Sequence, residues 1–302
     1  MEKYGQIKAN VMESNILTGY GKSFASFGEI IQGRKSNNED FLITIPIDLW
    51  SICTLTMIQR EGPRVINSNF EKSKQVAVII LDKLGVVANY ELNISFSRSI
   101  PIGKGLSSST ADMLSTIRAL QELFGFLLRP KVVSSIFKTI EPHDGLMYKS
   151  SVCYNHRTGT LLEDLDYVPK INIIAIDFGG VVDSIEYNKK LKYSDDILKQ
   201  YDHLYDETIN AFKNEDDYKI AQCATRSLEI DLISSEDAIR KKVLDSFKTL
   251  DAMGIINTHS GTCIGLIYPN SLSKTELKSK EEKVSSLFGY PTFSTSSLNL
   301  LT

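Results

Sequence analysis

The residues best suited to chemistry in this sequence form a loop at positions 101–109 (PIGKGLSSS), just before a predicted helix. Gly103 and Gly105 let the backbone approach a ligand closely, and a helix start presents amide donors and the positive end of its dipole. Serine hydroxyls can donate to phosphate oxygens or bind Mg²⁺. These features predict an anion site of the polyphosphate type. The alternative is that the serines only cap the helix, with Ser109 and Asp112 as a capping box.

A second group of polar residues follows at positions 141–145 (EPHDG). Glu141 and Asp144 bracket a proline at the end of a predicted helix, where they can be held at a fixed distance over a pocket. One carboxylate can hold Mg²⁺, and the other can accept a hydroxyl proton or orient the hydroxyl. The alternative for these residues taken alone is a plain turn with solvated acids.

Three other patterns predict no chemistry. Residues 19–23 (GYGKS) end like a nucleotide-binding P-loop, but Ile16 stands where the first glycine is required and a strand pattern follows. Residues 135–138 (SIFK) have a serine–lysine spacing without the further motifs that such enzymes carry, so an ordinary helix face is favoured. His259 and Cys263 are four positions apart, but Gly261 and the strand-like pattern do not suit a helical metal pair, and no third ligand is evident.

The elements that must position these residues are predicted as strands followed by helices. Hydrophobic alternation and apolar runs predict strands at 20–31, 41–47, 51–59, 90–97, 171–178 and 263–268, and a hairpin with arms at 153–154 and 160–162. Helical periodicity predicts helices at 70–84, 110–124, 194–212, 218–228, 236–253 and 275–287. The polar stretch 163–170 is the predicted boundary between two sub-domains.

Composition narrows the class of protein. The 302 residues carry a formal charge of −3, which argues against a general nucleic-acid binder. The four cysteines are far apart and form no CxxC pair, as expected for reduced, buried thiols in the cytosol. No membrane span or signal-peptide core is apparent. A soluble cytoplasmic globular protein is therefore expected, with no nucleic-acid or membrane partner.

The polar motifs together resemble those of one enzyme family. Residues 101–110 (PIGKGLSSST) resemble the second motif of the GHMP kinases, P-x-x-x-G-L-x-S-S-A, with Thr110 in place of the final alanine. Residues 26–33 (SFGEIIQG) resemble the first motif in the form of the propanediol-utilisation-type L-threonine kinase branch. Residues 141–144 match the E-P-T-D stretch of that branch, and residues 259–267 (HSGTCIGLI) its third motif. The four matches stand in the family's order.

The resemblance implies a fold and an activity. The fold is α+β, with a ribosomal protein S5 domain 2-like N-terminal domain at 1–168, a ferredoxin-like C-terminal domain at 169–302, and the active site between them. The activity is that of an ATP- and Mg²⁺-dependent kinase that phosphorylates the hydroxyl of L-threonine or a similar hydroxy amino acid and releases ADP. A homoserine- or sugar-type kinase and a non-catalytic nucleotide-binding regulatory protein remain alternatives. A homodimer is a further expectation.

The resemblance also implies residue roles. The nucleotide phosphates would be held by Pro101, Gly103, Lys104, Gly105, Leu106, Ser107, Ser108 and Ser109, and the metal by Ser108, Ser109 and Glu141. Asp144 would be the catalytic residue, and the acceptor would be bound by Glu29, Gln32, His143, Ser260, Gly261 and Thr262. Some branches place a lysine in the first motif beside the catalytic aspartate, whereas this chain has Gly28 and Glu29. Whether Asp144 acts as a base or only orients the hydroxyl is left open by these residues.

Overall fold

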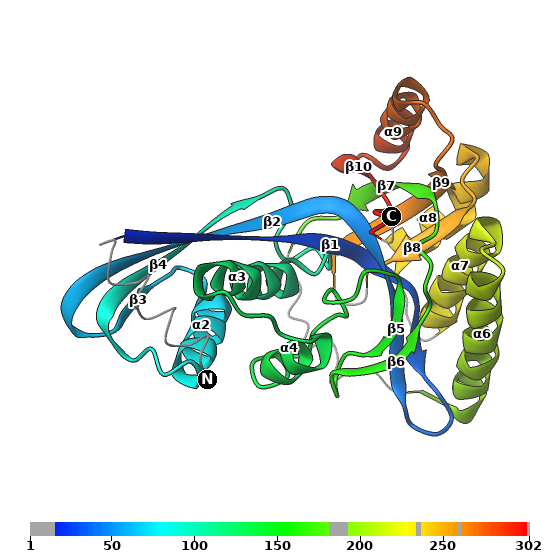
Figure 1. Ribbon diagram of the computed structural model, residues 1–302. Coiled ribbons are helices and arrows are strands. Elements are labelled where there is room, and N and C mark those ends of the chain that lie inside the picture. The colour runs from blue at the N-terminus through cyan, green and yellow to red at the C-terminus, as the bar shows by residue number, and fades with distance from the viewer. Residues whose placement is uncertain (1–15, 181–192, 234–236, 259–260, 301–302) are drawn as a thin grey trace.

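The computed structural model describes residues 16–180, 193–233, 237–258 and 261–300 (Figure 1). Within these residues, one mixed sheet follows the strand order β10-β7-β9-β8-β1-β2-β4-β3, with β5 paired to β2 and β6 paired to β5. The strands are β1 (Ile16–Arg34), β2 (Asp40–Pro63), β3 (Val65–Asn67), β4 (Ala88–Arg98), β5 (Val152–Asn155), β6 (Thr160–Asp164), β7 (Ile171–Asp177), β8 (Gly254–Asn257), β9 (Cys263–Pro269) and β10 (Thr292–Ser296).

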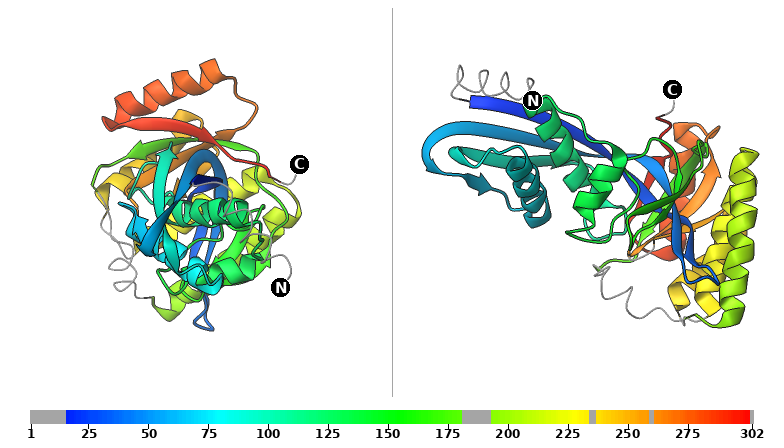
Figure 2. Two further views of the ribbon diagram at one scale, coloured as in Figure 1. Left: turned by 60° about the vertical axis from the view of Figure 1, so that its left-hand side comes forward. Right: turned by 60° about the horizontal axis from the view of Figure 1, so that its bottom comes forward.

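The helices pack on two different parts of this sheet. They are α2 (Glu71–Lys83), α3 (Ser108–Phe124), α4 (Pro130–Phe137), α6 (Asp195–Lys213), α7 (Asp217–Ile233), α8 (Ala238–Ser246), the 3₁₀ helix η1 (Phe247–Leu250) and α9 (Lys274–Phe288). Helix α3 packs against β1 and β2, whereas α6 and α7 pack at the other end of β1, and α7 also packs against β8 (Figures 1 and 2). The predicted mixed α and β composition is confirmed.

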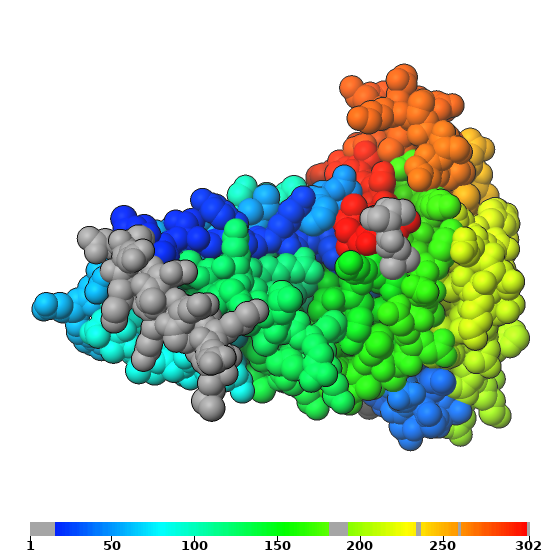
Figure 3. All heavy atoms as spheres, in the orientation of Figure 1, coloured from blue at the N-terminus to red at the C-terminus, as the bar shows by residue number. Residues whose placement is uncertain are grey.

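Strand β1 is long enough to reach both groups of helices. Its first half pairs with β2 above α3, and near its end Glu29 pairs with Asn257 of β8. The turn after β1 reaches α6, where the Ser36 amide donates to Asp202 at 3.1 Å, and Figure 3 shows this turn against the foot of that helix. One buried cluster contains side chains from both predicted halves, among them Phe27 and Ile267. The division at 168/169 stays a prediction.

The glycines of the 19–23 segment have a packing role in β1. A Cβ atom on Gly21 would lie 1.8 Å from the carbonyl oxygen of Ser115 in α3. The strand therefore lies directly on the helix backbone, which only glycine permits. This segment is a strand, as its pattern predicts, and the P-loop alternative is excluded for it.

The structure differs from the predicted elements in one strand, in one helix and in three short strands that were not predicted. Residues 41–47 and 51–59 belong to one strand, β2, because a register shift opposite Phe24 and Ala25 carries the chain through residues 48–50 without ending the strand. The helix predicted over 236–253 ends earlier, since Asp251 adopts a left-handed conformation (φ 56°) and β8 follows. Strands β3, β8 and β10 are too short to produce a clear periodic pattern. None of the described helices has the length and hydrophobicity needed to cross a bilayer.

Candidate active site

The glycine- and serine-rich loop leads directly into α3. Gly103 (φ 71°) and Gly105 (φ 79°) both take left-handed conformations, and so does Ser107 (φ 56°), the residue before the helix. Ser107 makes no side-chain capping hydrogen bond to the helix. The loop therefore leads without a side-chain cap into the first turn of α3, and Ser108, Ser109 and Thr110 of this turn line a pocket.

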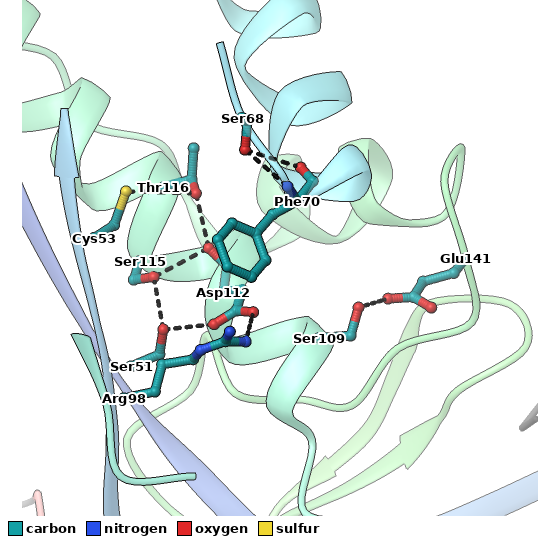
Figure 4. A network of polar contacts seen from close by, with 10 residues as sticks. All are labelled: Ser51, Cys53, Ser68, Phe70, Arg98, Ser109, Asp112, Ser115, Thr116 and Glu141. Carbon is teal, nitrogen blue, oxygen red and sulfur yellow. Dashed lines mark hydrogen bonds and ion pairs between the residues drawn. The ribbon is translucent and has the colours of Figure 1, made fainter. Parts of the chain in front are cut away.

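The capping-box alternative is wrong. The Asp112 carboxylate accepts hydrogen bonds from Ser51 of β2 at 2.6 Å and from Arg98 of β4 at 2.8 Å, and it points away from the pair formed by Ser109 and Glu141 (Figure 4). The Arg98 guanidinium also lies 4.5 Å from the centre of the Phe70 ring. Burial raises the pKa of Asp112, whereas the contacts with Ser51 and Arg98 lower it. This network ties the first turns of α3 to strands β2 and β4, and it therefore fixes the position of the helix start.

The loop packs against the turn between β8 and β9. A Cβ atom on Gly105 would lie 2.6 Å from Cβ of Thr258, and one on Gly261 would lie 2.1 Å from the carbonyl oxygen of Lys104. On the other side of this turn, a Cβ atom on Gly28 would lie 2.3 Å from the carbonyl oxygen of Asn257. Three glycine-containing motifs that are far apart in the sequence thus meet with their backbones in contact.

The two acidic side chains lie over the start of α3. Glu141 accepts hydrogen bonds from Ser109 and from Lys72 of α2, and Figure 4 shows the first of these. Asp144 accepts a hydrogen bond from Ser107, whose hydroxyl also contacts that of Ser26. Burial raises the pKa of Asp144, the Ser107 hydrogen bond lowers it, and the nearby Glu141 carboxylate raises it, with a net increase. The plain-turn alternative for the two acids does not hold, because both side chains are engaged with the serines.

These side chains share one pocket of about 250 Å³. The residues that line it come from β1, β2, α2, the loop and the start of α3, the acidic segment and the turn after β5: Glu29, Leu42, Lys72, Ile102, Gly103, Gly105, Leu106, Ser107, Ser108, Ser109, Thr110, Glu141, Pro142, His143, Asp144 and His156. The pocket therefore brings together both acids, Glu29, His143 and most of the predicted loop residues, whereas Pro101 and Lys104 do not line it. Within the described residues, no group of three or more histidine, cysteine or acidic side chains forms a ready metal cluster.

Other predicted residues have side chains engaged elsewhere. The Lys104 ammonium contacts Asp177 at 2.8 Å and the carbonyl of Gly180 at 3.0 Å, and the Thr262 hydroxyl donates to the same Asp177 at 3.1 Å. Burial raises the pKa of Asp177, but the hydrogen bonds from Lys104, the Gly179 amide and Thr262 together lower it by more, so the net shift of the pKa is downward. Asp177 thus holds the loop and the 261–262 turn together. Ser260 lies outside the described residues.

His143 and Gln32 also turn to protein partners. The buried His143 ring hydrogen-bonds with the hydroxyls of Tyr154 at 2.8 Å and Ser134 at 3.3 Å, and burial lowers its pKa to about 4. A neutral ring in this place supports the loop that carries Asp144. Gln32 donates to Asp231 of α7 at 2.8 Å.

Sequence reasoning missed Lys72, Asp177 and the contact between Ser26 and Ser107. Lys72 is one lysine among several on a helix with exposed charges, so its pattern has no distinguishing signal. Ser26 is the first residue of the 26–33 motif, and its position there is a usable signal. Asp177 ends a buried strand, but its partner Lys104 is 73 positions away.

Comparison with known proteins places these features in context. Residues 71–148 match the family model described as "GHMP kinases N terminal domain". The chain is 25% identical to an L-threonine kinase of Salmonella typhimurium over 254 residues (80% of each chain) and 22% identical to an L-threonine kinase of Citrobacter freundii over 255 residues (80% of this chain and 84% of that one). The crystal structure of a homoserine kinase from Cytophaga hutchinsonii has the same fold, with a TM-score of 0.69 at 13% identity, over 95% of this chain and 96% of that one.

Proposed function

Because the chain is a GHMP-type kinase, a phosphotransferase with an alcohol group as acceptor, we propose that it transfers the γ-phosphoryl group of ATP to the hydroxyl of L-threonine or a similar hydroxy amino acid. The observation that carries the proposal is one pocket in which Asp144 and Glu141 stand over the glycine- and serine-rich start of α3. The similarity to two L-threonine kinases over four fifths of the chain supports the acceptor class.

The loop at 101–109 is assigned to the ATP phosphates. Its glycines allow the backbone to approach a ligand closely, and Ser107, Ser108 and Ser109 line the pocket at the start of α3, where a helix offers free amide donors. The Lys104 ammonium is already paired with Asp177. Backbone amides and hydroxyls therefore carry the phosphate contacts, and Lys104 fixes the loop.

The residues present fit a magnesium ion. Ser109 and Glu141 contact each other and offer the hydroxyl and carboxylate oxygens that Mg²⁺ prefers, and Ser108 is the next oxygen donor along the helix. When bound, Mg²⁺ neutralises charge on the β- and γ-phosphates. The Lys72 ammonium forms an ion pair with Glu141, so the metal ion and this ammonium would share the carboxylate.

Asp144 is assigned to the acceptor hydroxyl. In the transfer, the bond between the γ-phosphorus and the ADP oxygen breaks, a bond from the acceptor oxygen to phosphorus forms, and the hydroxyl proton leaves. Asp144 can accept a hydrogen bond from that hydroxyl and hold its proton, because burial raises its pKa above that of an ordinary aspartate. Ser107 fixes the carboxylate in place. Most of the rate enhancement would come from positioning and charge stabilisation.

An ADP-release assay tests the proposal. Purified protein with MgATP is offered L-threonine, L-serine, L-homoserine and galactose, and the product is identified by phosphorus NMR. Release of ADP together with O-phosphothreonine is the expected result. Turnover of galactose alone would favour a sugar-type kinase. Binding of ATP without turnover of any acceptor would favour a regulatory protein.

A further inference from the structure

A cluster of polar side chains lies next to Glu29 and to the turn between β8 and β9. We call Asn257, Asp231 and Arg240 the Asn257 cluster; they come from β8, α7 and α8. Gln32 and Tyr201 hold Asp231 by hydrogen bonds of 2.8 and 2.6 Å, one to each carboxylate oxygen.

Asn257 carries an unmet hydrogen-bonding capacity. Its side chain is 4% exposed, and neither its amide nitrogen nor its amide oxygen has a hydrogen-bond partner among the described residues. Burial raises the pKa of the Asp231 carboxyl, and the hydrogen bonds from Tyr201 and Gln32, the Arg240 charge and the nearby Asn257 amide each lower it in part. Asn257 is thus close to Asp231, although the pair does not have the geometry of a full hydrogen bond. A buried donor and acceptor left unpaired are destabilising, so such groups are usually paired.

The position of Asn257 directs this capacity toward the pocket. Asn257 and Glu29 are register partners on the antiparallel strands β8 and β1. Side chains that are directly opposite each other in such a pair lie on the same face of the sheet, with Cβ atoms about 5 Å apart. Glu29 lines the pocket that contains Asp144. The Asn257 amide therefore stands next to the acceptor side of that pocket.

Arg240 adds an incompletely paired cation. Its side chain is 15% exposed, and its Nε has no hydrogen-bond partner among the described residues. One carboxylate oxygen of Asp237 lies 3.5 Å from this Nε, and Nη2 is 3.4 Å from the carbonyl oxygen of Gly261. Gly261 packs against Gly105, which lines the pocket, so a single backbone contact separates the residue that Arg240 approaches from the pocket lining.

We infer that the Asn257 cluster binds the zwitterionic head group of an amino-acid acceptor, with Arg240 and the Asn257 amide nitrogen on its carboxylate, and Asp231 and the Asn257 amide oxygen on its ammonium. The inference rests on the proposed function and specifies how the acceptor is recognised. A cation, an anion and an amide with both a donor and an acceptor match an amino acid, which carries both charges. A sugar would leave the buried charges without partners, and such sites reject analogues strongly.

The arrangement also orients the acceptor for transfer. A head group at Asn257 would lie beside Glu29, which lines the same pocket as Asp144. A hydroxyl on the short side chain of the same amino acid then points toward Asp144. The Asn257 cluster would therefore select both the class of acceptor and its orientation.

The test compares L-threonine with L-threonine amide, which keeps the ammonium and the hydroxyl but has no carboxylate. For Arg240→Met, the KM for L-threonine should rise roughly 10- to 100-fold, the range that losing one charge-assisted hydrogen bond corresponds to, with a smaller change in kcat. The KM for the amide should change little. Asp231→Asn should weaken the use of both compounds, because both carry the ammonium. Arg226→Met is the matched control, since Arg226 lies on the surface of α7 and pairs with Glu229.

Calorimetric titration of L-threonine into the same proteins gives a readout without turnover. If Arg240→Met leaves the preference of wild type for threonine over its amide unchanged, the inference is overturned. Should that variant fail to fold, Arg240→Lys and the wild-type preference itself decide the matter: equal use of both compounds contradicts the inference. If no alcohol releases ADP, the proposed function fails, and the titration still tests the Asn257 cluster. Turnover of galactose without binding of threonine would reject the inference, whereas the assignment of the protein as a kinase would stand.

Discussion

The Ser107 hydroxyl donates a hydrogen bond to the Asp144 carboxylate, which joins the last loop residue before α3 to the acidic segment after α4. Ser107 has a left-handed backbone, and its hydroxyl also contacts that of Ser26 in β1. Three segments of the chain therefore define where this carboxylate stands. The geometry gives Asp144 a fixed position before any ligand is bound.

Replacing Asp144 with asparagine should lower kcat by about 100-fold or more, because a positioned general base contributes roughly that much. ATP binding should be retained, since the phosphate contacts are assigned to the loop and α3. Steady-state kinetics and calorimetric titration of ATP measure the two effects. Asp206→Asn, on the exposed face of α6, is the control and should behave as wild type. Full activity in Asp144→Asn would remove Asp144 from the reaction.

Replacing Glu141 with glutamine should raise the Mg²⁺ concentration needed for half-maximal ATP binding by about tenfold, because one charged ligand is replaced by a neutral one. The measurement is calorimetric titration of ATP at several Mg²⁺ concentrations. Lys72→Met should have the opposite effect, since it removes the ammonium that shares Glu141. Lys74→Met, two positions along α2, provides the comparison. An unchanged Mg²⁺ requirement in Glu141→Gln would place the metal elsewhere.

Replacing Gly105 with alanine should destabilise the protein by about 3 kcal/mol or more and weaken ATP binding. The new Cβ atom would lie 2.6 Å from Cβ of Thr258, and relieving this clash costs free energy of folding. The left-handed backbone at this position costs a non-glycine residue about 1 kcal/mol more. Gly85→Ala separates the two effects: its φ is 69°, and no heavy atom lies within 4 Å of the new Cβ. We expect that variant to lose only about 1 kcal/mol. Urea denaturation measures both, and equal losses would refute the close contact.

The protein should become less stable as the pH rises from 8 to 10. Burial raises the pKa of the Cys53, Cys153 and Cys263 thiols from 9.0 to about 12. In the unfolded chain these thiols ionise near pH 9, while the folded state keeps them protonated, so alkaline pH favours unfolding. Each thiol contributes about 1 kcal/mol of this loss at pH 10.

Urea midpoints at pH 7 and pH 10 measure the alkaline effect. Cys263→Ala should lose stability at both pH values, because it leaves a small cavity, but the difference between the two values should be smaller than in wild type. If the pH dependence of Cys263→Ala equals that of wild type, this thiol is not protected from ionisation by burial.

Much of the fold could be predicted from local patterns, and the acidic and serine residues of the site from their motifs. The helix start near Ser108 and the strand over 90–97 have clear periodicity. Lys72 and Asn257 could not be found in this way, because their importance depends on partners that only the tertiary structure supplies. Lys72 meets Glu141 across 69 positions, and Asn257 meets Glu29 across the sheet. The side-chain directions of Lys104 and His143 were likewise set by partners, Asp177 and Tyr154.

The length of β1 has a consequence for cutting the chain in two. Its second half is covered by elements that follow residue 168: a Cβ atom on Gly33 would lie 2.6 Å from the ring of Tyr201 in α6, and Asn257 pairs with Glu29. A fragment 1–168 would expose that buried surface and should aggregate when it is expressed alone. Co-expression with 169–302 should restore a stable complex, so the two pieces would behave as complementing fragments of one folding unit.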